Sequence, residues 1–231
     1  MSRLTKILIA TAVAVVLLLV GGGFAIYKVF LESDAKPPAK ITKTTTVGGG
    51  NLDGTYRAAP GPAEDPTFVG YRVQEQLAAV GVESTATGRT SEVTGSFTID
   101  GMTVKDVTVD ANLLSLKSDR DMRDNRIKTL GLESEKFPQS KFVLTQPISF
   151  KSVPNVGETV RATAKGDFTL HGVTRPVSIP LEGRWDGRDI QVIGNLDVRF
   201  ADYQIEAPNI GGFVSVKDQG VMEFKILFSK A

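Results

Sequence analysis

The sequence has no cysteine, one histidine and almost no net charge, and each scarcity removes a class of function. Without cysteine, the 231-residue chain forms no disulfide, thiolate metal site or thiol nucleophile. A single histidine, His171, cannot build a histidine metal cluster. The formal net charge of +1, with no block of Lys or Arg, gives no general attraction to nucleic acid. We therefore expect no metal, no redox-active thiol and no nucleic acid partner.

Common catalytic motifs are missing as well. The chain contains no Gly-Lys-Ser phosphate loop and no Gly-x-Ser-x-Gly nucleophile elbow. Its 26 acidic residues leave a carboxylate pair open, because sequence alone cannot measure the separation that glycosidase chemistry requires. We expect a protein without catalytic activity and without a cofactor, apart from any bound lipid.

One long apolar run is present near the N-terminus. It extends from Ile7 to Tyr27 without a charge and follows Arg3 and Lys6. As a helix, 21 residues reach roughly 31 Å, which matches a hydrocarbon core of about 30 Å. Basic residues before the run and acidic residues soon after it predict a cytoplasmic N-terminus. We predict a signal anchor, a single transmembrane helix over residues 1–31, that places the rest of the chain outside the cell membrane.

A cleaved signal peptide is the alternative interpretation of the same run. Gly21, Gly22 and Gly23 supply small residues for cleavage, which would release a secreted or periplasmic domain. The apolar character nevertheless continues from Phe24 to Leu31, where a cleavage region should become polar. We therefore prefer the anchor, and both interpretations export the remainder of the chain.

Residues 32–53 resemble a linker in composition. They are rich in Lys, Thr, Pro and Gly and almost free of apolar side chains. A flexible coil of about 20 residues would hold its domain on the order of 25 Å from the membrane surface. We predict a flexible linker over 32–53 and a folded domain over 54–231.

Alternating apolar residues dominate the chain from residue 54 onward and predict half-buried strands. Asp100-Gly101 and Asp186-Gly187 lie between strand candidates and favour tight antiparallel hairpins. Proline and glycine predict loops over 57–66 and 206–212. The strand candidates cover 68–75, 93–100, 104–113, 141–146, 160–170, 176–181, 190–200 and 222–228.

One segment, residues 118–132, departs from the alternating pattern and predicts a short helix. Ser118 and Asp121 have the spacing of a capping box, and Gly131 marks the end. We expect an apolar side facing the sheet and a charged side facing outward or around an opening. The first comprises Met122, Ile127 and Leu130, and the second comprises Arg120, Asp121, Arg123, Asp124 and Arg126.

The fold class that follows is all-β. About eight strands joined by hairpins, with one short helix, predict either a closed antiparallel barrel or a two-sheet sandwich. Periodicity does not separate these two architectures.

Three stretches resemble the YceI-like polyisoprenoid-binding family. The run from Gly166 to Val177, GDFTLHGVTRPV, is the most specific. An Arg-Asp-rich helix followed by Lys136-Phe137-Pro138 and Lys141-Phe142 agrees in order and spacing, and the stretch from Thr67 to Val73 resembles the first strand of the family. The resemblance covers residues 54–231 and excludes the anchor and linker.

The resemblance implies an extended, eight-stranded, lipocalin-like antiparallel barrel in the extracytoplasmic space. Its implied ligand is a long amphiphilic isoprenoid lipid, a polyprenyl chain or a quinone. Family members often have a cleaved signal and a free periplasmic domain, so the long apolar segment here is a departure that would restrict the range of a lipid carrier.

The candidate ligand-binding residues are those on the apolar side of the strands. Periodicity alone favours a solid core in which these side chains simply pack, whereas the resemblance favours a lipid inside the barrel. The candidates are Tyr71, Phe97, Val109, Phe142, Phe168, Leu170, Leu196, Phe200, Phe224 and Ile226.

Arg123, Arg126 and His171 are candidates for contact with a lipid head group. The two arginines suit a phosphate through charge-assisted hydrogen bonds, and the imidazole suits a phosphate or a quinone oxygen. Each has a structural alternative: a solvated helix face for the arginines and a turn residue bonded to backbone for His171.

The function predicted from these observations is extracytoplasmic binding of an isoprenoid lipid for sequestration or short-range transfer. The partners are the lipid and, through the N-terminal helix, the membrane, and a homodimer stays open. The alternative is a surface interaction or stress-associated module with a solid barrel and a protein partner.

Overall fold

The computed structural model describes residues 21–22, 34–43, 49–77, 82–210 and 214–231. The predicted anchor over 1–31 lies outside the described residues except at Gly21 and Gly22. Among the helices that are described, none is long and apolar enough to cross a membrane. The division into anchor, linker and barrel domain stays a prediction.

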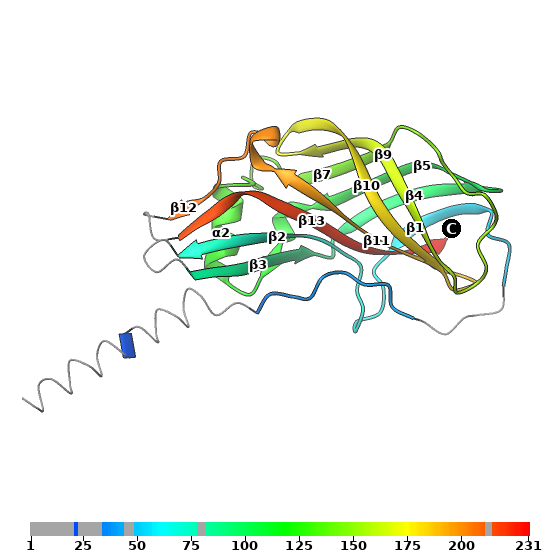
Figure 1. Cartoon of the computed structure of the whole chain (residues 1–231), viewed down its shortest axis with the longest axis horizontal. Helices are drawn as coiled ribbons and strands as arrows, with labels where there is room; N and C mark the ends of the chain where they lie inside the picture. Colours follow the sequence, from blue (N-terminus) through cyan, green and yellow to red (C-terminus); the bar gives the residue numbers. More distant parts are fainter. Residues whose placement is uncertain (1–20, 23–33, 44–48, 78–81, 211–213) are drawn as a thin grey trace, which may run out of the picture.

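Strands make up most of the described chain, with short helices between them (Figure 1). The strands are β1 (Gly54–Ala59), β2 (Phe68–Leu77), β3 (Val82–Thr90), β4 (Val93–Asp100), β5 (Thr103–Asn112), β6 (Lys117–Ser118), β7 (Gln139–Leu144), β8 (Ile148–Ser149), β9 (Thr159–Leu170), β10 (Val173–Trp185), β11 (Ile190–Arg199), β12 (Asn209–Ile210) and β13 (Val214–Lys230). The helices that follow β5, β6 and β11 are η2 (Leu113–Ser115), α2 (Asp121–Thr129) and η3 (Phe200–Tyr203).

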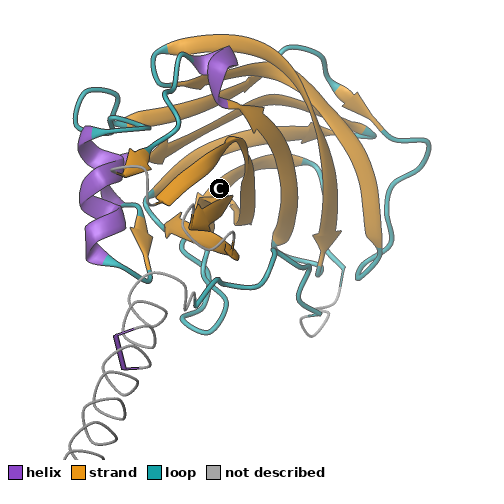
Figure 2. Cartoon of the chain, turned by 60° about the vertical axis from the view of Figure 1, so that its left-hand side comes forward, coloured by secondary structure: helices purple, strands orange, loops and turns teal. Residues whose placement is uncertain are grey.

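Eight of the described strands form a closed ring in the order β1-β4-β5-β7-β9-β10-β11-β13, and the pairing of β1 with β13 closes it. Every neighbouring pair in the ring is antiparallel. Figure 2 shows these strands curving around a common interior, with α2 at its outer edge. The predicted all-β fold with an eight-stranded antiparallel barrel and a short helix is confirmed, and the sandwich alternative is wrong.

The longest strand, β13, is the seam of the barrel. One of its edges pairs with β11, and the other pairs with β2 along its first part and with β1 along its last four residues. At about 3.3 Å per residue, its 17 residues extend over about 55 Å. The strands β2 and β3 thus lengthen the wall beyond the ring, at the end where α2 lies.

Two hairpins predicted from Asp-Gly pairs are present and differ in length. Asp100 pairs with Thr103, so the turn between β4 and β5 has only two residues, and Gly101 has a φ of 57°. Trp185 pairs with Ile190, which leaves a four-residue turn between β10 and β11. The longer turn is possible because the Asp186 carboxylate accepts hydrogen bonds from two backbone amides within it.

Several strands of the structure were not predicted, among them β1, β3 and β12. The predicted loop over 57–66 is wrong for its first three residues, because β1 runs to Ala59. Strand β3 contains mostly Thr, Ser, Gly and charged residues, so it lacks the apolar alternation that identifies a strand. In the predicted loop over 206–212, residues 209–210 form the short strand β12.

The predicted orientation of the helix is wrong in three places. Met122 and Leu130 are 56% and 57% exposed, whereas Asp124 is buried. Asp124 accepts a hydrogen bond from the amide of Ser118 and pairs with Lys117, so a polar contact holds the inner side of α2. The predicted cap also fails: Ser118 belongs to β6, and α2 begins at Asp121 without a side-chain cap.

Residues 34–43, which we call the strap, belong to the predicted flexible linker. They have no secondary structure, yet they lie along the outer wall of the barrel near β3, β2 and β11 (Figure 1). The Lys36 amide donates to Thr87 Oγ1 at 3.0 Å, and the Thr42 amide donates to Gln191 Oε1 at 2.6 Å. These bonds dock the strap on the barrel, and the flexible linker over 32–53 stays a prediction.

Candidate functional site

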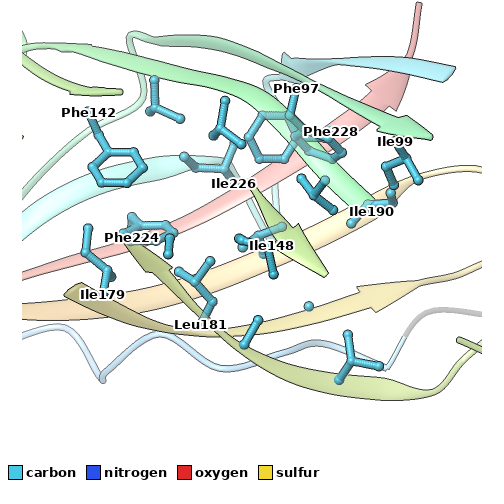
Figure 3. Close-up of a pocket in the computed structure, with 18 of the residues that line it drawn as sticks. Phe97, Ile99, Phe142, Ile148, Ile179, Leu181, Ile190, Phe224, Ile226 and Phe228 are labelled. Carbon is cyan, nitrogen blue, oxygen red and sulfur yellow. The ribbon is translucent and has the colours of Figure 1, made fainter. Parts of the chain in front are cut away.

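The interior of the barrel contains a cavity of about 180 Å³ with an almost entirely apolar lining. We call it the inner cavity. Its wall comes from β4, β5, β7, β9, β10, β11 and β13, so the side chains that meet there are far apart in the sequence. Figure 3 shows Phe97 and Phe228 at one end of this wall and Phe142 at the other.

Small residues at inward positions keep this interior open. The inward side of β9 presents Ala162 and Ala164 to the cavity, and the neighbouring β10 presents Gly183. Side chains fill the interior of an ordinary eight-stranded barrel, because the ring is only just wide enough for them. Alanine and glycine at these positions leave volume that larger residues would occupy.

Two glycines let aromatic rings lie flat against the wall. A Cβ on Gly194 would stand 2.6 Å from Cζ of Phe224, and a Cβ on Gly166 would stand 2.5 Å from Cζ of Phe142. Real Cβ atoms do not approach other atoms so closely, so both positions require glycine. The rings therefore cover backbone and do not project into the cavity.

A second cavity, also of about 180 Å³, opens beside α2. We call it the outer cavity. Tyr71 and Phe200 line its apolar part, and Arg123 and Arg126 line its charged part. A thin layer separates the two cavities: Met222 lines the inner one and is the cross-strand partner of Tyr71, which lines the outer one.

The two arginines on the wall of the outer cavity, Arg123 and Arg126, differ in their ion pairs. The guanidinium of Arg123 donates two bonds of 2.9 Å to Glu75 and a further bond to Asp119. Burial alone would raise the pKa of the Asp119 carboxyl, but the charge and hydrogen bond of Arg123 outweigh burial and lower it. Arg126 has no side-chain partner within the described part of the chain. Arg126 is therefore the cation free to bind an anion there.

Tyr71 presents an unused hydrogen-bonding group beside the outer cavity. Its hydroxyl is buried and has no partner among the described residues, and burial raises the pKa of the phenol. Buried polar atoms are normally satisfied, so an orphan hydroxyl beside a cavity indicates a ligand or a water molecule. The indole Nε1 of Trp185, which lines the inner cavity, is unpaired in the same way within the described ranges.

His171 occupies the turn between β9 and β10 and lines neither cavity. Its φ of 52° is left-handed, as is the φ of 74° at Gly172. The ring is buried, with Nδ1 3.0 Å from the carbonyl oxygen of Tyr203 and Nε2 2.8 Å from Oε2 of Glu133. Both ring nitrogens are thus engaged in holding the turn to the rest of the barrel.

The ten predicted lining residues divide between the cavities. Phe97, Val109, Phe142, Phe168, Phe224 and Ile226 line the inner cavity, and Tyr71 and Phe200 line the outer one. Leu170 and Leu196 line neither and instead pack in the apolar cluster around Phe168 and Tyr203. Their role in binding a ligand stays a prediction.

Several residues that line the inner cavity were not predicted from the sequence. Trp185 lies on the wall of the inner cavity, as do Ile190 and Phe228 at the same end. Leu52 also lines the cavity although it belongs to the predicted linker. The signal that would have found the cavity is the repetition of small residues at inward positions of β9. Among the described residues, no cluster of three or more His, Asp or Glu has the arrangement of a metal site.

Two UPF0312 proteins are similar to this chain in sequence. A UPF0312 protein of Pseudomonas putida is 34% identical over 105 residues, or 44% of this chain and 51% of that protein. The chain thus spans about half the length of that relative. A UPF0312 protein of Vibrio campbellii is 28% identical over 139 residues, or 56% of this chain and 70% of that protein.

Solved structures share the fold at low sequence identity. A polyisoprenoid binding domain from Saccharophagus degradans superposes with a TM-score of 0.59 at 17% identity, over 78% of this chain and 99% of that domain. BcnA of Burkholderia cenocepacia has a TM-score of 0.50 at 13% identity, over 68% of this chain and 95% of that protein. The YceI-like domain matches residues 64–228, which is well over half of the sequence. The chain therefore belongs to the YceI-like family.

Proposed function

We propose that this protein holds a long amphiphilic isoprenoid lipid, a polyprenyl chain or a quinone, inside its barrel on the outer side of the cell membrane. The observation that carries the proposal is the apolar inner cavity, kept open by alanine and glycine at inward positions. A structural neighbour is described as a polyisoprenoid binding domain, which agrees with this ligand class.

The size of the cavities indicates how such a lipid would lie. Each cavity has a volume of about 180 Å³. An engineered apolar cavity of roughly 150 Å³ takes a benzene-sized ligand, so one cavity here holds a short stretch of chain. A long chain needs both cavities, joined by rotation of the separating side chains. Met222 in that layer has an unbranched, flexible side chain suited to such movement.

Burial of the hydrocarbon chain supplies the affinity. Each CH₂-sized group withdrawn from water contributes about 0.8 kcal/mol, so ten such groups contribute about 8 kcal/mol before the cost of ordering the chain. No covalent step is involved, and the protein acts by binding. With the predicted anchor intact, it would store the lipid or pass it over a short range.

Native mass spectrometry of the full chain, purified from a lipid-replete host, tests this function. We expect a bound isoprenoid that organic extraction releases. Ala162→Phe places a ring in the inner cavity and should reduce lipid occupancy at least tenfold. Thr163→Phe is the matched control, because Thr163 lies on the exposed outer side of the same strand. Absence of lipid from the unmodified chain would favour the interaction module with a protein partner.

A further inference from the structure

The outer wall of the barrel has a charged track that the strap covers. Glu223 on β13 is only 4% exposed and pairs with Arg89 at 2.8 Å and with Arg72 at 3.5 Å. Charged residues are seldom buried on the outer side of a barrel, because water normally reaches them. Here the backbone of the strap takes the place of water.

Charged side chains of this track donate hydrogen bonds to the strap at several points along its length. Arg72 donates to the carbonyl oxygen of Lys36 at 2.6 Å, and Arg89 donates to that of Pro37. Farther along, Lys225 is 6% exposed and donates to the Thr42 hydroxyl at 2.6 Å. These charge-assisted bonds give the strap one position and one direction on the barrel.

The strap begins beside the outer cavity. The amide of Asp34 lies 3.4 Å from Oδ2 of Asp119, which is bonded to Arg123 on the wall of that cavity. At the opposite end, the carbonyl oxygen of Asn51 accepts a bond of 2.6 Å from Lys230, the last residue of β13. The chain therefore reaches the barrel at its α2 end and travels to the other end before β1 begins.

The predicted anchor limits the distance between the membrane and the α2 end of the barrel. Its apolar run ends at Tyr27, and seven residues, 28–34, span at most about 25 Å when fully extended. The far end of the barrel lies about 55 Å away along β13. A docked strap thus keeps the outer cavity near the membrane, whereas a free linker would allow any orientation.

The surface of α2 suits contact with a bilayer. Met122 and Arg126 are four residues apart on α2 and share one side of the helix, and Leu130 caps its C-terminal end; Met122 and Leu130 are more than half exposed. Between Lys117 and Leu130 the chain has five basic and three acidic residues. Exposed apolar side chains beside an excess of basic residues are typical of surfaces that lie at a lipid interface.

We propose, building on the anchored lipid-binding function, that the strap holds the α2 end of the barrel against the membrane surface and that lipid passes through the outer cavity. Arg126 meets the lipid head group there, and Tyr71, whose hydroxyl has no partner among the described residues, lies on the wall of the same cavity. The docking partner is the bilayer itself.

Site-specific quenching tests this orientation, since the chain has no cysteine and one introduced thiol labels one position. Met122→Cys marks α2, and Met102→Cys marks the 48% exposed turn at the far end of the barrel. Each full-length variant carries a nitrobenzoxadiazole label in phosphatidylcholine–phosphatidylglycerol vesicles with spin-labelled lipid. We expect at least threefold stronger quenching at position 122. Equal quenching, or stronger quenching at position 102, would overturn the proposal.

A variant of the barrel wall tests the cause of the orientation. The combined substitutions Arg72→Met, Arg89→Met and Glu223→Met remove the guanidinium donors to the carbonyl oxygens of Lys36 and Pro37, leave no carboxylate of that cluster unpaired, and keep the length of the chain. We expect the quenching ratio to fall toward one while the circular dichroism spectrum stays unchanged. A folded variant that keeps the original ratio would show that the strap does not orient the barrel.

Two further measurements separate this inference from the proposed function. Flotation with vesicles reports the anchor, and a chain that does not float overturns both the anchor and the orientation. Lipid extraction reports the ligand. A barrel free of lipid that still shows strong quenching at position 122 would overturn lipid binding and support the orientation.

Discussion

Gly194 on β11 lies directly opposite Phe224 on β13, and the ring of Phe224 covers it so closely that a Cβ would stand 2.6 Å from Cζ. Gly194→Ala must therefore displace the ring toward the inner cavity. We expect the free energy of unfolding to fall by about 1–3 kcal/mol, as for other overpacked cores. Lipid occupancy measured by native mass spectrometry should fall as well.

Gly183→Ala is the matched control for this substitution. Gly183 also lines the inner cavity, but a Cβ there would lie 3.8 Å from Val160, an ordinary contact. Its unfolding free energy in a denaturant titration should stay within about 0.5 kcal/mol of the original. Equal destabilisation by both alanines would contradict the flat-ring arrangement.

Lys225 and Asp65 form a pair beside the strap, and their titration is a second prediction. Burial alone would raise the pKa of the Asp65 carboxyl, but hydrogen bonds from Lys225 and Thr42 and the charge of Lys225 lower it below 3.8. A lowered pKa stabilises the fold above pH 3.8, and this stabilisation is lost as the pH falls through the folded value. Lys225→Met should raise the pKa of Asp65 in an NMR titration and weaken folding by about 1–3 kcal/mol at pH 7.

The exposed pair of Lys105 and Asp100 is the control for this titration. Lys105 likewise lowers the pKa of Asp100 through a hydrogen bond of 2.8 Å. Both groups are in water, so Lys105→Met should leave the unfolding midpoint unchanged. If Lys225→Met had no more effect than Lys105→Met, the docking of the strap by Lys225 would be wrong.

Arg123 and Arg126 should respond differently to the same change. Arg123→Gln leaves the partly buried Glu75 without its cation and leaves Asp119 with Arg120 at 3.6 Å, so the unfolding free energy should fall by about 1–3 kcal/mol. Arg126→Gln should alter stability by less than about 0.5 kcal/mol. It should reduce the preference for a polyprenyl phosphate over the corresponding alcohol about tenfold, in a competition assay read by native mass spectrometry. An unchanged preference would remove Arg126 from the head-group site.

His171 offers a test of a structural role against a ligand role. His171→Asn retains a residue that tolerates the left-handed φ of 52° but loses the hydrogen bond to Glu133. We expect a loss of about 1–2 kcal/mol with unchanged lipid occupancy. His171→Val should cost more, because a β-branched residue strains at positive φ. Lost lipid with full stability in the Asn variant would indicate head-group contact instead.

The strands with regular alternation could be predicted from the sequence because one side of each faces an apolar interior. Strand β11 was predicted over 190–200 and observed over Ile190–Arg199 for this reason. Strand β3 was missed because its outer position beyond the ring lets polar residues occupy most of its length. Alternation of apolar and polar residues thus indicates that one side of a strand is buried. It does not identify a strand that is held in place mainly by its backbone hydrogen bonds.

The candidate site was predictable in its residues but not in its shape. The alternation of apolar residues predicted that Phe142 and Phe224 face the interior. Only the structure shows that their rings lie flat, because Gly166 and Gly194 lie next to them in space. The predicted orientation of α2 was wrong because the helical pattern treats every charged side chain as exposed. Asp124 is buried because β6, just before the helix, offers it the amide of Ser118 and the side chain of Lys117.

The position of β13 as the seam has a consequence for biogenesis. It is the last strand of the barrel, and it must pair with β11, β2 and β1 before the ring is closed. During synthesis the earlier strands emerge first, so the growing chain can form only an open sheet until residues 214–230 have been added. Closure of the barrel therefore follows the synthesis of this strand, and a chain stalled before it would expose an apolar surface for chaperones and proteases to recognise.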